Sequence, residues 1–243
     1  MNEALRGEEV AGARPEPIFA RGPTEGPQIL IVQPLFAERN RTRILIGDVM
    51  RRLAAHGIGC WLPELPGEGE SATLLEQTSW AAWRAAVAAA ADHVAARSGS
   101  VPFVASLRGG ALLDDAAAAR GWWRLAPTGG AALLRDVMRA QLMADREAGR
   151  GGSLASLDAA ALAGPVSLAG MTLTPPLYAG LRDAVPAEVQ PLRIVRFEGD
   201  GGNASDRLAG EALWRRAEPG RSADTADLIA ADIRSWIETC GAT

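Results

Sequence analysis

Short apolar runs alternate with longer amphipathic segments along most of the chain. The apolar runs predict strands at 28–33, 59–62, 101–105, 122–126 and 192–197, with shorter ones at 166–168 and 212–216. The segments between them repeat apolar residues at helical spacing and predict helices at 41–56, 80–97, 111–120, 129–146 and 224–238. This alternation favours an α/β fold, with a mainly parallel sheet of about seven or eight strands and helices on both faces.

The first of these helices shows how the pattern sets an element and its ends. Asn40 is a suitable N-cap, and Gly57 is suitable for the turn that follows the helix. The apolar residues form a single stripe of Leu45, Ile46, Val49, Met50 and Leu53. One face of this helix is therefore expected to pack on the sheet.

Two regions depart from the alternation. Residues 1–27 are rich in Gly, Pro, Glu and Arg and predict a loosely ordered arm, with a short edge strand at Ile18–Phe19. Residues 28–243 are expected to form a single domain. Within it, an insertion at about 128–164 holds an amphipathic helix, a glycine-rich turn and a second, short helix. Such an insertion lies over the C-terminal ends of the strands, where open α/β sheets bind ligands, so we expect a lid.

Composition narrows the possible functions. Apolar residues make up 48% of the 243 and charged residues 22%, a balance typical of a globular protein with a sizeable core. The net charge is −4 without a basic cluster, so nucleic-acid binding is not expected. No apolar run approaches the roughly 20 residues of a membrane span, and the polar N-terminus is unlike a signal peptide. Cys60 and Cys240 do not have the spacing of a metal-binding pair, which favours a location in the reducing cytoplasm. We expect no bound metal and no cofactor.

The stretch VPFVASLRGGALL, residues 101–113, has the layout of a nucleophile elbow. A short strand leads into a tight glycine turn and then into an Ala/Leu-rich helix. Such a turn surrounds one reactive side chain with small residues, in the order small-x-nucleophile-x-Gly. Ser106 and Gly110 fill the small positions, which leaves Arg108 at the reactive one. Because a guanidinium stays protonated and cannot be a nucleophile, the pattern predicts a hydrolase scaffold whose central residue has been exchanged.

A serine hydrolase also needs a histidine base and an acid that orients it. The histidines are His56 and His93, and both precede the elbow, whereas this scaffold places its histidine after the last strand. Ser106 lies two residues before the apex of the turn and is expected to pack in the interior. Asp200 follows a predicted strand, in the loop where such scaffolds place the triad acid. An oxyanion hole alone gives roughly 10³–10⁴-fold over water, so we expect no efficient triad chemistry.

Further motifs carry a family resemblance. They are PLFAERN at 34–40, a Gly-x-Gly-x-Ser turn at 67–71, LRGGALL at 107–113 and AGMTLTP at 169–175. The turn at 67–71 resembles the one that follows the fourth strand of α/β-hydrolases. The other three motifs together resemble the second type of exosortase A system-associated hydrolase, a bacterial group linked to exopolysaccharide and protein-sorting gene clusters. The resemblance covers 28–181 and implies an α/β-hydrolase fold with arginine at the elbow. The chain differs from the group at Ser106, where glycine is usual, and at Arg39, where a second glutamate is usual.

Arg108 needs a partner, because a cation at a helix N-terminus is disfavoured by roughly 0.3–1 kcal/mol. Glu38 is the best internal candidate, since in this fold its loop flanks the oxyanion hole. The alternative is an anionic ligand held by Arg108 and the adjacent backbone N–H groups. The residues expected to contact a ligand are Arg108, Gly109, Gly110, Glu38, Asn40 and Phe36.

Two functions are compatible with these features. The first is an α/β-hydrolase-fold protein without a working triad that binds a small anionic or acyl ligand, or a partner, in an exosortase-linked pathway. The second is an active hydrolase, of esterase or thioesterase type, with a non-standard catalytic arrangement. Arg108 and the lack of a histidine after His93 favour the first.

Overall fold

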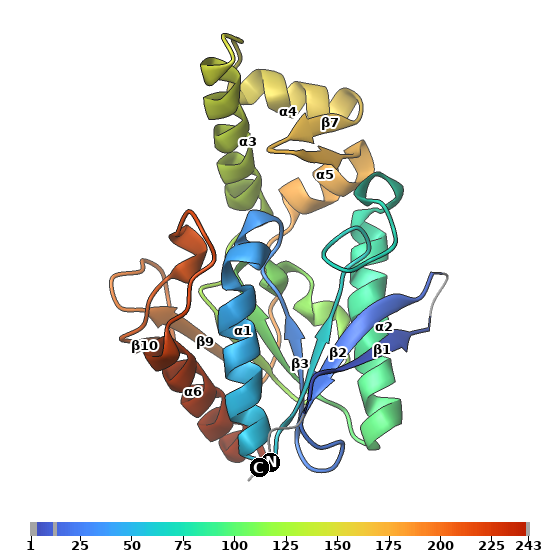
Figure 1. The fold of residues 1–243 in the computed structure, drawn as a ribbon, viewed down its shortest axis with the longest axis vertical. Coiled ribbons are helices and arrows are strands. Elements are labelled where there is room, and N and C mark those ends of the chain that lie inside the picture. The colour runs from blue at the N-terminus through green and yellow to red at the C-terminus, as the bar shows by residue number, and fades with distance from the viewer. Residues whose placement is uncertain (1–3, 12–13, 242–243) are drawn as a thin grey trace.

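The computed structural model describes residues 4–11 and 14–241, and its centre is one eight-stranded sheet (Figure 1). The strands are β1 Arg6–Val10, β2 Glu16–Arg21, β3 Gln28–Val32, β4 Gly59–Pro63, β5 Phe103–Leu107, β6 Trp122–Leu125, β9 Leu192–Phe197 and β10 Asp206–Leu208. Their spatial order is β1-β2-β4-β3-β5-β6-β9-β10. β2 runs antiparallel to β1 and β4, and the other neighbours pair in parallel. The mainly parallel sheet predicted from the sequence is confirmed.

Helices cover both faces of the sheet, as the alternation predicts. The three long ones are α1 Ala37–Ala55, α2 Trp80–Ser98 and α6 Ala223–Gly241. α1 and α6 lie side by side on one face, and α2 lies on the other (Figure 1). β3 is buried along its whole length and contributes to both cores. Because side chains alternate along a strand, Ile29 and Ile31 pack with α1 and α6, while Leu30 and Val32 pack with α2.

A cap of residues 130–183 sits above the carboxyl ends of the strands (Figure 1). It consists of α3 Gly130–Glu147, α4 Leu154–Ala163, β7 Val166–Leu168, β8 Met171–Leu173 and α5 Pro175–Asp183. β7 and β8 form a separate two-stranded sheet. The expected return to the main sheet at 166–168 is therefore wrong, and the insertion is longer than 128–164. The reason is packing, since Leu168 is buried against α3 and α4 of the cap.

Much of the N-terminal segment belongs to the main sheet. β1 forms one edge and β2 joins it to β4, so the loosely ordered arm expected over 1–27 is wrong for the described residues. The strand expected at Ile18–Phe19 lies within β2. Residues 1–3 and 12–13 of that expectation lie outside the described residues. The polar sequence of β1 gives no alternating signal, because the strand pairs with β2 through its backbone and its Glu8 side chain contacts His93 and Arg97 of α2.

The other edge of the sheet also differs from the expectation. The last strand is β10, and residues 212–216 instead contain the short 3₁₀ turn η4 (Leu213–Arg215). The side chains of Leu213 and Trp214 are buried, and the turn packs against α1. These contacts hold the segment away from the edge of the sheet.

The helix expected at 111–120 is wrong as well. Two 3₁₀ turns take its place, η2 Arg108–Leu112 and η3 Asp114–Ala116. Asp114 is fully buried, and its carboxylate accepts hydrogen bonds from Ser106 and Arg124. Its backbone carbonyl accepts a hydrogen bond from the Trp122 indole at 3.0 Å. These long-range contacts override the helical preference of the Ala/Leu-rich sequence.

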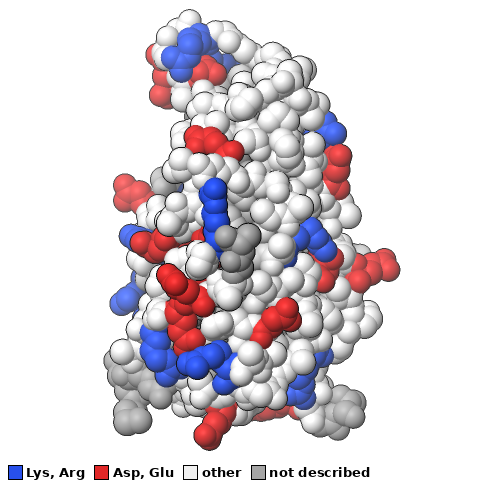
Figure 2. All heavy atoms as spheres, turned by 90° about the vertical axis from the view of Figure 1, so that its right-hand side faces the viewer, with Lys and Arg blue, Asp and Glu red and all other residues white. Residues whose placement is uncertain are grey.

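The described residues contain no helix that is both long and apolar enough to cross a membrane. On the face that carries α2 and part of the cap, acidic and basic side chains are interspersed among broad uncharged areas (Figure 2). The described part of this face therefore offers no continuous cationic strip for a phosphate backbone.

Candidate functional site

Arg108 occupies the apex of the turn after β5, as the sequence predicts. Its backbone φ is 54°, in the left-handed region that side chains disfavour. The turn approaches β3 so closely that a Cβ at Gly110 would lie 2.4 Å from the carbonyl oxygen of Val32, and only glycine fits there. This sharp, strained turn is the backbone geometry of a nucleophile elbow.

The Arg108 side chain is 16% exposed and is held by three neighbours. Its Nε and Nη2 atoms donate to the Glu38 carboxylate at distances of 3.2 and 3.0 Å, and Nη1 donates to the carbonyl oxygen of Ala126 at 3.2 Å. The guanidinium carbon lies 5.2 Å from the ring centre of Trp214, in a cation–π contact. The internal ion pair expected from the sequence is present.

Glu38 lies in the first turn of α1, where the helix dipole favours negative charge. Burial raises the pKa of its carboxyl group, and Arg108 opposes that shift through its charge and hydrogen bonds. Asp136 of α3 adds a second negative charge, which raises the pKa further. Arg108 thus offsets part of the cost of burying the Glu38 carboxylate.

A second charged cluster adjoins this pair, on the loop that follows β4. The buried Glu64 carboxylate accepts two hydrogen bonds from Arg39 Nη2, at 2.6 and 2.7 Å. Glu68, on the same loop, accepts a hydrogen bond from the backbone N–H of Phe36. Burial raises the pKa of Glu68 to about 7. The negative charge of Glu64 adds to this rise, and the positive charge of Arg39 opposes it. The cluster joins the loop after β4 to the loop after β3.

A cavity of about 690 Å³ opens beside Arg108, between α1, the cap and the loop that carries η4. This volume is within the range of small-molecule sites. Much of its wall is apolar and includes Leu35, Phe36, Leu133, Val137, Ala140 and Met171. The charged side chains of the lining are Arg41, Arg108, Arg215, Glu38 and Asp136. Arg108 is paired with Glu38, and Arg215 is paired with Asp200 just outside the lining.

Three of the residues expected to contact a ligand line this cavity, namely Arg108, Glu38 and Phe36. Asn40 does not, because α1 begins at Ala37 and Asn40 is an exposed residue in its first turn instead of its N-cap. The helix starts earlier than predicted because Phe36, at a φ of 57°, turns the chain there and buries its ring.

Gly109 and Gly110 are buried beneath the turn and do not line the cavity. A Cβ at Gly109 would lie 3.1 Å from Leu133 and 3.2 Å from Leu35, so these side chains cover it. The segment is a five-residue 3₁₀ turn, which lacks the aligned peptide dipoles of an α-helix N-terminus. The anion site expected at the backbone N–H groups of Gly109 and Gly110 depended on an α-helix that does not form. Of this turn, only Arg108 lines the cavity.

Neither of the other residues considered for triad chemistry reaches the cavity. Ser106 is fully buried, and its Oγ donates to Asp114 Oδ2 at 2.6 Å. Asp200 lies in the turn after β9, where its Oδ1 accepts a hydrogen bond from Arg215 Nη2 at 2.6 Å. Ser106 therefore packs in the interior, as the sequence predicts, and Asp200 forms an ion pair with Arg215 of the cavity lining.

Both histidines are held far from the elbow in other contacts. His93 Nε2 lies 3.0 Å from the carboxylate of Glu8 on β1, and His56 Nδ1 lies 3.1 Å from a guanidinium nitrogen of Arg234. Neither histidine lines the cavity. Among the described residues, no group of three or more His, Cys, Asp or Glu side chains is arranged to hold a metal ion.

The loop after β10 is where this scaffold places its catalytic histidine. In this chain the loop brings Trp214 over the guanidinium of Arg108, and an indole cannot accept a proton as a base. Arg108, Asp200 and Trp214 thus lie on the three loops that carry nucleophile, acid and base in a triad. Their arrangement can hold a ligand, but it supplies neither a nucleophile nor a base of the triad type.

Sequence reasoning missed Trp214 and the buried group of Ser106, Asp114 and Arg124. The sequence held a signal for the buried group. Two adjacent aspartates, Asp114 and Asp115, interrupt the apolar segment in which a helix was expected. Trp214 had a weaker signal, a lone indole in a segment otherwise rich in Gly, Pro and Arg. Its place beside Arg108 depends on the path of the whole loop.

Solved structures with a similar fold include Est1E from Butyrivibrio proteoclasticus with ferulic acid bound, at a TM-score of 0.62 and 13% identity over 97% of this chain and 100% of that one. A mutant of potato epoxide hydrolase has a TM-score of 0.60 and 15% identity over 97% and 100% of the two chains. The thioesterase domain from the curacin biosynthetic pathway has a TM-score of 0.53 and 14% identity over 97% and 99%. No protein-family model and no curated protein matches the chain. At these identities the likeness concerns the fold alone.

Proposed function

Because the chain has the α/β-hydrolase fold with an arginine at the nucleophile position, we propose that it binds a small carboxylate or acyl anion at Arg108 and performs no Ser-His-Asp hydrolysis. The observation that carries this proposal is the guanidinium of Arg108, which lies on the elbow and lines the 690 Å³ cavity.

The hydrogen bonds of Arg108 leave room for a ligand. A guanidinium has five N–H donors. Within the described residues, Glu38 engages one donor on Nε and one on Nη2, and Ala126 engages one on Nη1. One donor on Nη1 and one on Nη2 remain for the oxygens of a ligand carboxylate.

The rest of the lining suits an apolar body attached to that carboxylate. Leu133 and Val137 of α3 face the cavity together with Met171 of β8. Arg41 adds positive charge at the same cavity, where it attracts an anion. A carboxylate with an alkyl chain or an aromatic ring matches both parts of the lining.

Placement in an exosortase-linked, exopolysaccharide pathway and a cytoplasmic location are part of the same proposal. The motifs at 34–40, 107–113 and 169–175 support the pathway, and the two free cysteines, Cys60 and Cys240, support the location. The Arg–Glu pair of the site is built from two of these motifs, since Glu38 lies in the first and Arg108 in the second.

Calorimetric titration with octanoate tests the binding site directly. We expect octanoate to bind at least tenfold more tightly than 1-octanol, which has the same chain without the charge. Ferulate is a second probe, because it is a carboxylate on an aromatic ring and is bound in the Est1E structure. Arg108→Met should weaken both carboxylates at least tenfold. Arg234→Met removes an arginine of α6 that is no part of the cavity lining and should leave their affinity unchanged.

Turnover of p-nitrophenyl butyrate distinguishes the proposal from a non-standard hydrolase. We expect a rate no greater than that of heat-denatured protein, because no histidine base lies at the elbow. Sustained turnover that a fluorophosphonate abolishes would show an unrecognised nucleophile. Equal affinity for octanoate and octanol, or an unchanged affinity in Arg108→Met, would remove the carboxylate site.

A further inference from the structure

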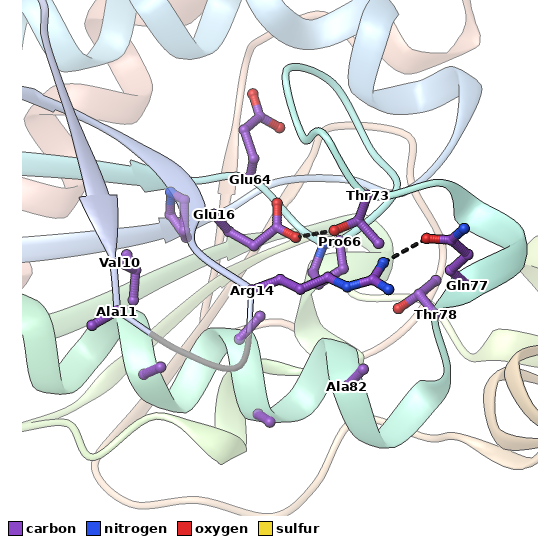
Figure 3. A pocket seen from close by; sticks show the side chains of 14 residues that line it. Val10, Ala11, Arg14, Glu16, Glu64, Pro66, Thr73, Gln77, Thr78 and Ala82 are labelled. Atoms are coloured by element: carbon purple, nitrogen blue, oxygen red, sulfur yellow. Dashed lines mark hydrogen bonds between the residues drawn. The ribbon is translucent and has the colours of Figure 1, made fainter.

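A second cavity, of about 450 Å³, lies on the α2 side of the molecule (Figure 3). It is bounded by α2, the ends of β1 and β2, and the segment between β4 and α2, which includes the 3₁₀ turn η1 (Leu75–Gln77). It shares no lining residue with the Arg108 cavity. It is therefore a separate site, and its ligand chemistry is independent of the function proposed for Arg108.

One wall of this cavity is a row of alanines. Ala82, Ala85, Ala86 and Ala89 follow one another at helical spacing and so share a face of α2. None of the four is fully buried, unlike Val87 on the core side of the same helix. Their small side chains leave the helix surface hollow, and the wall can contact an apolar body without donating or accepting a hydrogen bond.

The opposite side of the cavity carries a buried carboxylate. Glu16 of β2 is 6% exposed, and its Oε1 accepts a hydrogen bond from Thr73 Oγ1 at 2.7 Å. In Figure 3 its carboxylate lies between β2 and the loop of Thr73, across the cavity from the alanines of α2. Oε2 is buried and has no hydrogen-bond partner among the described residues. Thr78 also lines the cavity with a buried Oγ1 that has no partner. A buried polar atom without a partner is unfavourable, so these two atoms point to a ligand that supplies donors.

Glu16 is the carboxylate of this lining whose ionic partner is missing among the described residues. Glu64 also lines the cavity, but its charge is balanced by Arg39. Arg14 lines the cavity as well, and its guanidinium extends to a hydrogen bond with Gln77 Oε1, away from Glu16 (Figure 3). Glu16 has no ion pair within the described chain, which leaves one uncompensated buried carboxylate facing an apolar wall.

We infer that this cavity binds a primary amine with an apolar body. The ammonium group donates to Oε2 of Glu16, and the body lies against the alanine face of α2. An ammonium carries its donors on a compact head and supplies the positive charge that Glu16 lacks. A neutral alcohol of the same shape matches the wall but leaves the charge of Glu16 uncompensated.

Titration calorimetry with 2-phenylethylamine and 2-phenylethanol tests this inference. The amine should bind at least tenfold more tightly than the alcohol. Glu16→Gln should remove most of that difference, because the amide keeps the shape and the contact with Thr73 but loses the charge. Ala86→Leu should abolish binding of the amine by filling the cavity. Ala96→Leu, at an exposed position of the same helix outside the lining, is the matched control and should bind as the unchanged protein does.

Each outcome decides a different part of the inference. Equal binding of amine and alcohol, or unchanged amine binding in Glu16→Gln, would overturn the choice of a cation. Unchanged amine binding in a folded Ala86→Leu protein would overturn the location. Arg108→Met should leave amine binding intact and Glu16→Gln should leave octanoate binding intact, so failure at one cavity is distinguishable from failure at the other.

Discussion

Two arginine–carboxylate pairs lie at the carboxyl ends of neighbouring strands, and they differ in what surrounds them. Arg124 of β6 is 2% exposed and its partner Asp114 is 0% exposed. Arg124 donates twice to Asp114, at 2.7 and 2.8 Å, and once to the carbonyl oxygen of Ala187 at 2.8 Å. Arg108 and Glu38 are 16% and 12% exposed, and their hydrogen bonds of 3.0 and 3.2 Å are longer.

The difference separates a structural pair from one that can exchange partners. Arg124 and Asp114 are enclosed by protein, so a ligand cannot reach them without opening the core. Arg108 and Glu38 line a cavity, where an incoming carboxylate meets the guanidinium from the open side. The same two chemical groups therefore fix the turn after β5 in one place and form a candidate binding site in the other.

Removing one partner of the buried pair should have the largest effect. Arg124→Met leaves the Asp114 carboxylate buried without its cation, and we expect the free energy of unfolding to fall by about 3–5 kcal/mol. Adding Asp114→Asn should recover part of the loss, because the neutral amide no longer needs a counter-charge. Urea unfolding of both variants measures these differences.

An exposed arginine provides the control for this prediction. Arg97→Met removes the exposed pair with Glu8 on β1 and should cost less than about 1 kcal/mol. If the double variant at positions 114 and 124 proved less stable than Arg124→Met alone, an uncompensated charge would not be the cause of the loss.

A carboxyl group without an arginine of its own extends the comparison. Arg39 pairs with Glu64, and Glu68 beside them has a pKa raised by burial to about 7, against an ordinary value of 4.5. A raised pKa means that folding favours the protonated acid, so the contribution of Glu68 to stability is fully present below pH 4.5 and is lost as the pH rises to about 7. Glu68→Gln removes this dependence. We expect it to match the unchanged protein at pH 4.5 and to exceed its stability at pH 8 by about 2 kcal/mol.

Thermal or urea unfolding of Glu68→Gln across this pH range checks the sign as well as the size. Glu70→Gln, at an exposed position two residues later, should change stability little at either pH. A Glu68→Gln protein less stable than the unchanged one at pH 8 would mean that the hydrogen bond to Phe36 outweighs the burial of the charge.

The sheet and the meeting of Arg108 with Glu38 could both be predicted from the sequence. Apolar runs report burial directly, which locates the central parallel strands. Glu38 follows β3 and Arg108 follows β5, and because these strands are neighbours, the residues after them meet at the same edge. Local pattern and strand order were sufficient for this part of the site.

Other features depended on contacts that no local pattern contains. The helix expected at 111–120 gave way to 3₁₀ turns because Asp114 is bound by residues of β5 and β6. Trp214 reaches Arg108 only through the path of the loop after β10. The second cavity could not be predicted for a different reason. The apolar pattern of α2 identifies its buried stripe, but it does not show that the alanines on the other side of the helix line a cavity.

The smallest change in stability, and the sharpest test of the comparison, is expected at Arg108 itself. Arg108→Met should lower the free energy of unfolding near neutral pH by about 1 kcal/mol, less than at Arg124, because Glu38 can take up a proton or contact water in the cavity. Without Arg108 the pKa of Glu38 should rise further above its ordinary value. The loss should then be small at pH 4 and grow as the pH rises, since only the ionised carboxylate needs the cation.

Glu38→Gln separates the two roles of this pair. It leaves Arg108 in the cavity but removes the negative charge that competes with a ligand, so octanoate should bind several-fold more tightly than to the unchanged protein. Combined with Arg108→Met, it should restore part of the lost stability without restoring octanoate binding. If Glu38→Gln weakened octanoate binding instead, Glu38 would be orienting Arg108 for the ligand, and the pair would act as a fixed unit like Arg124 and Asp114.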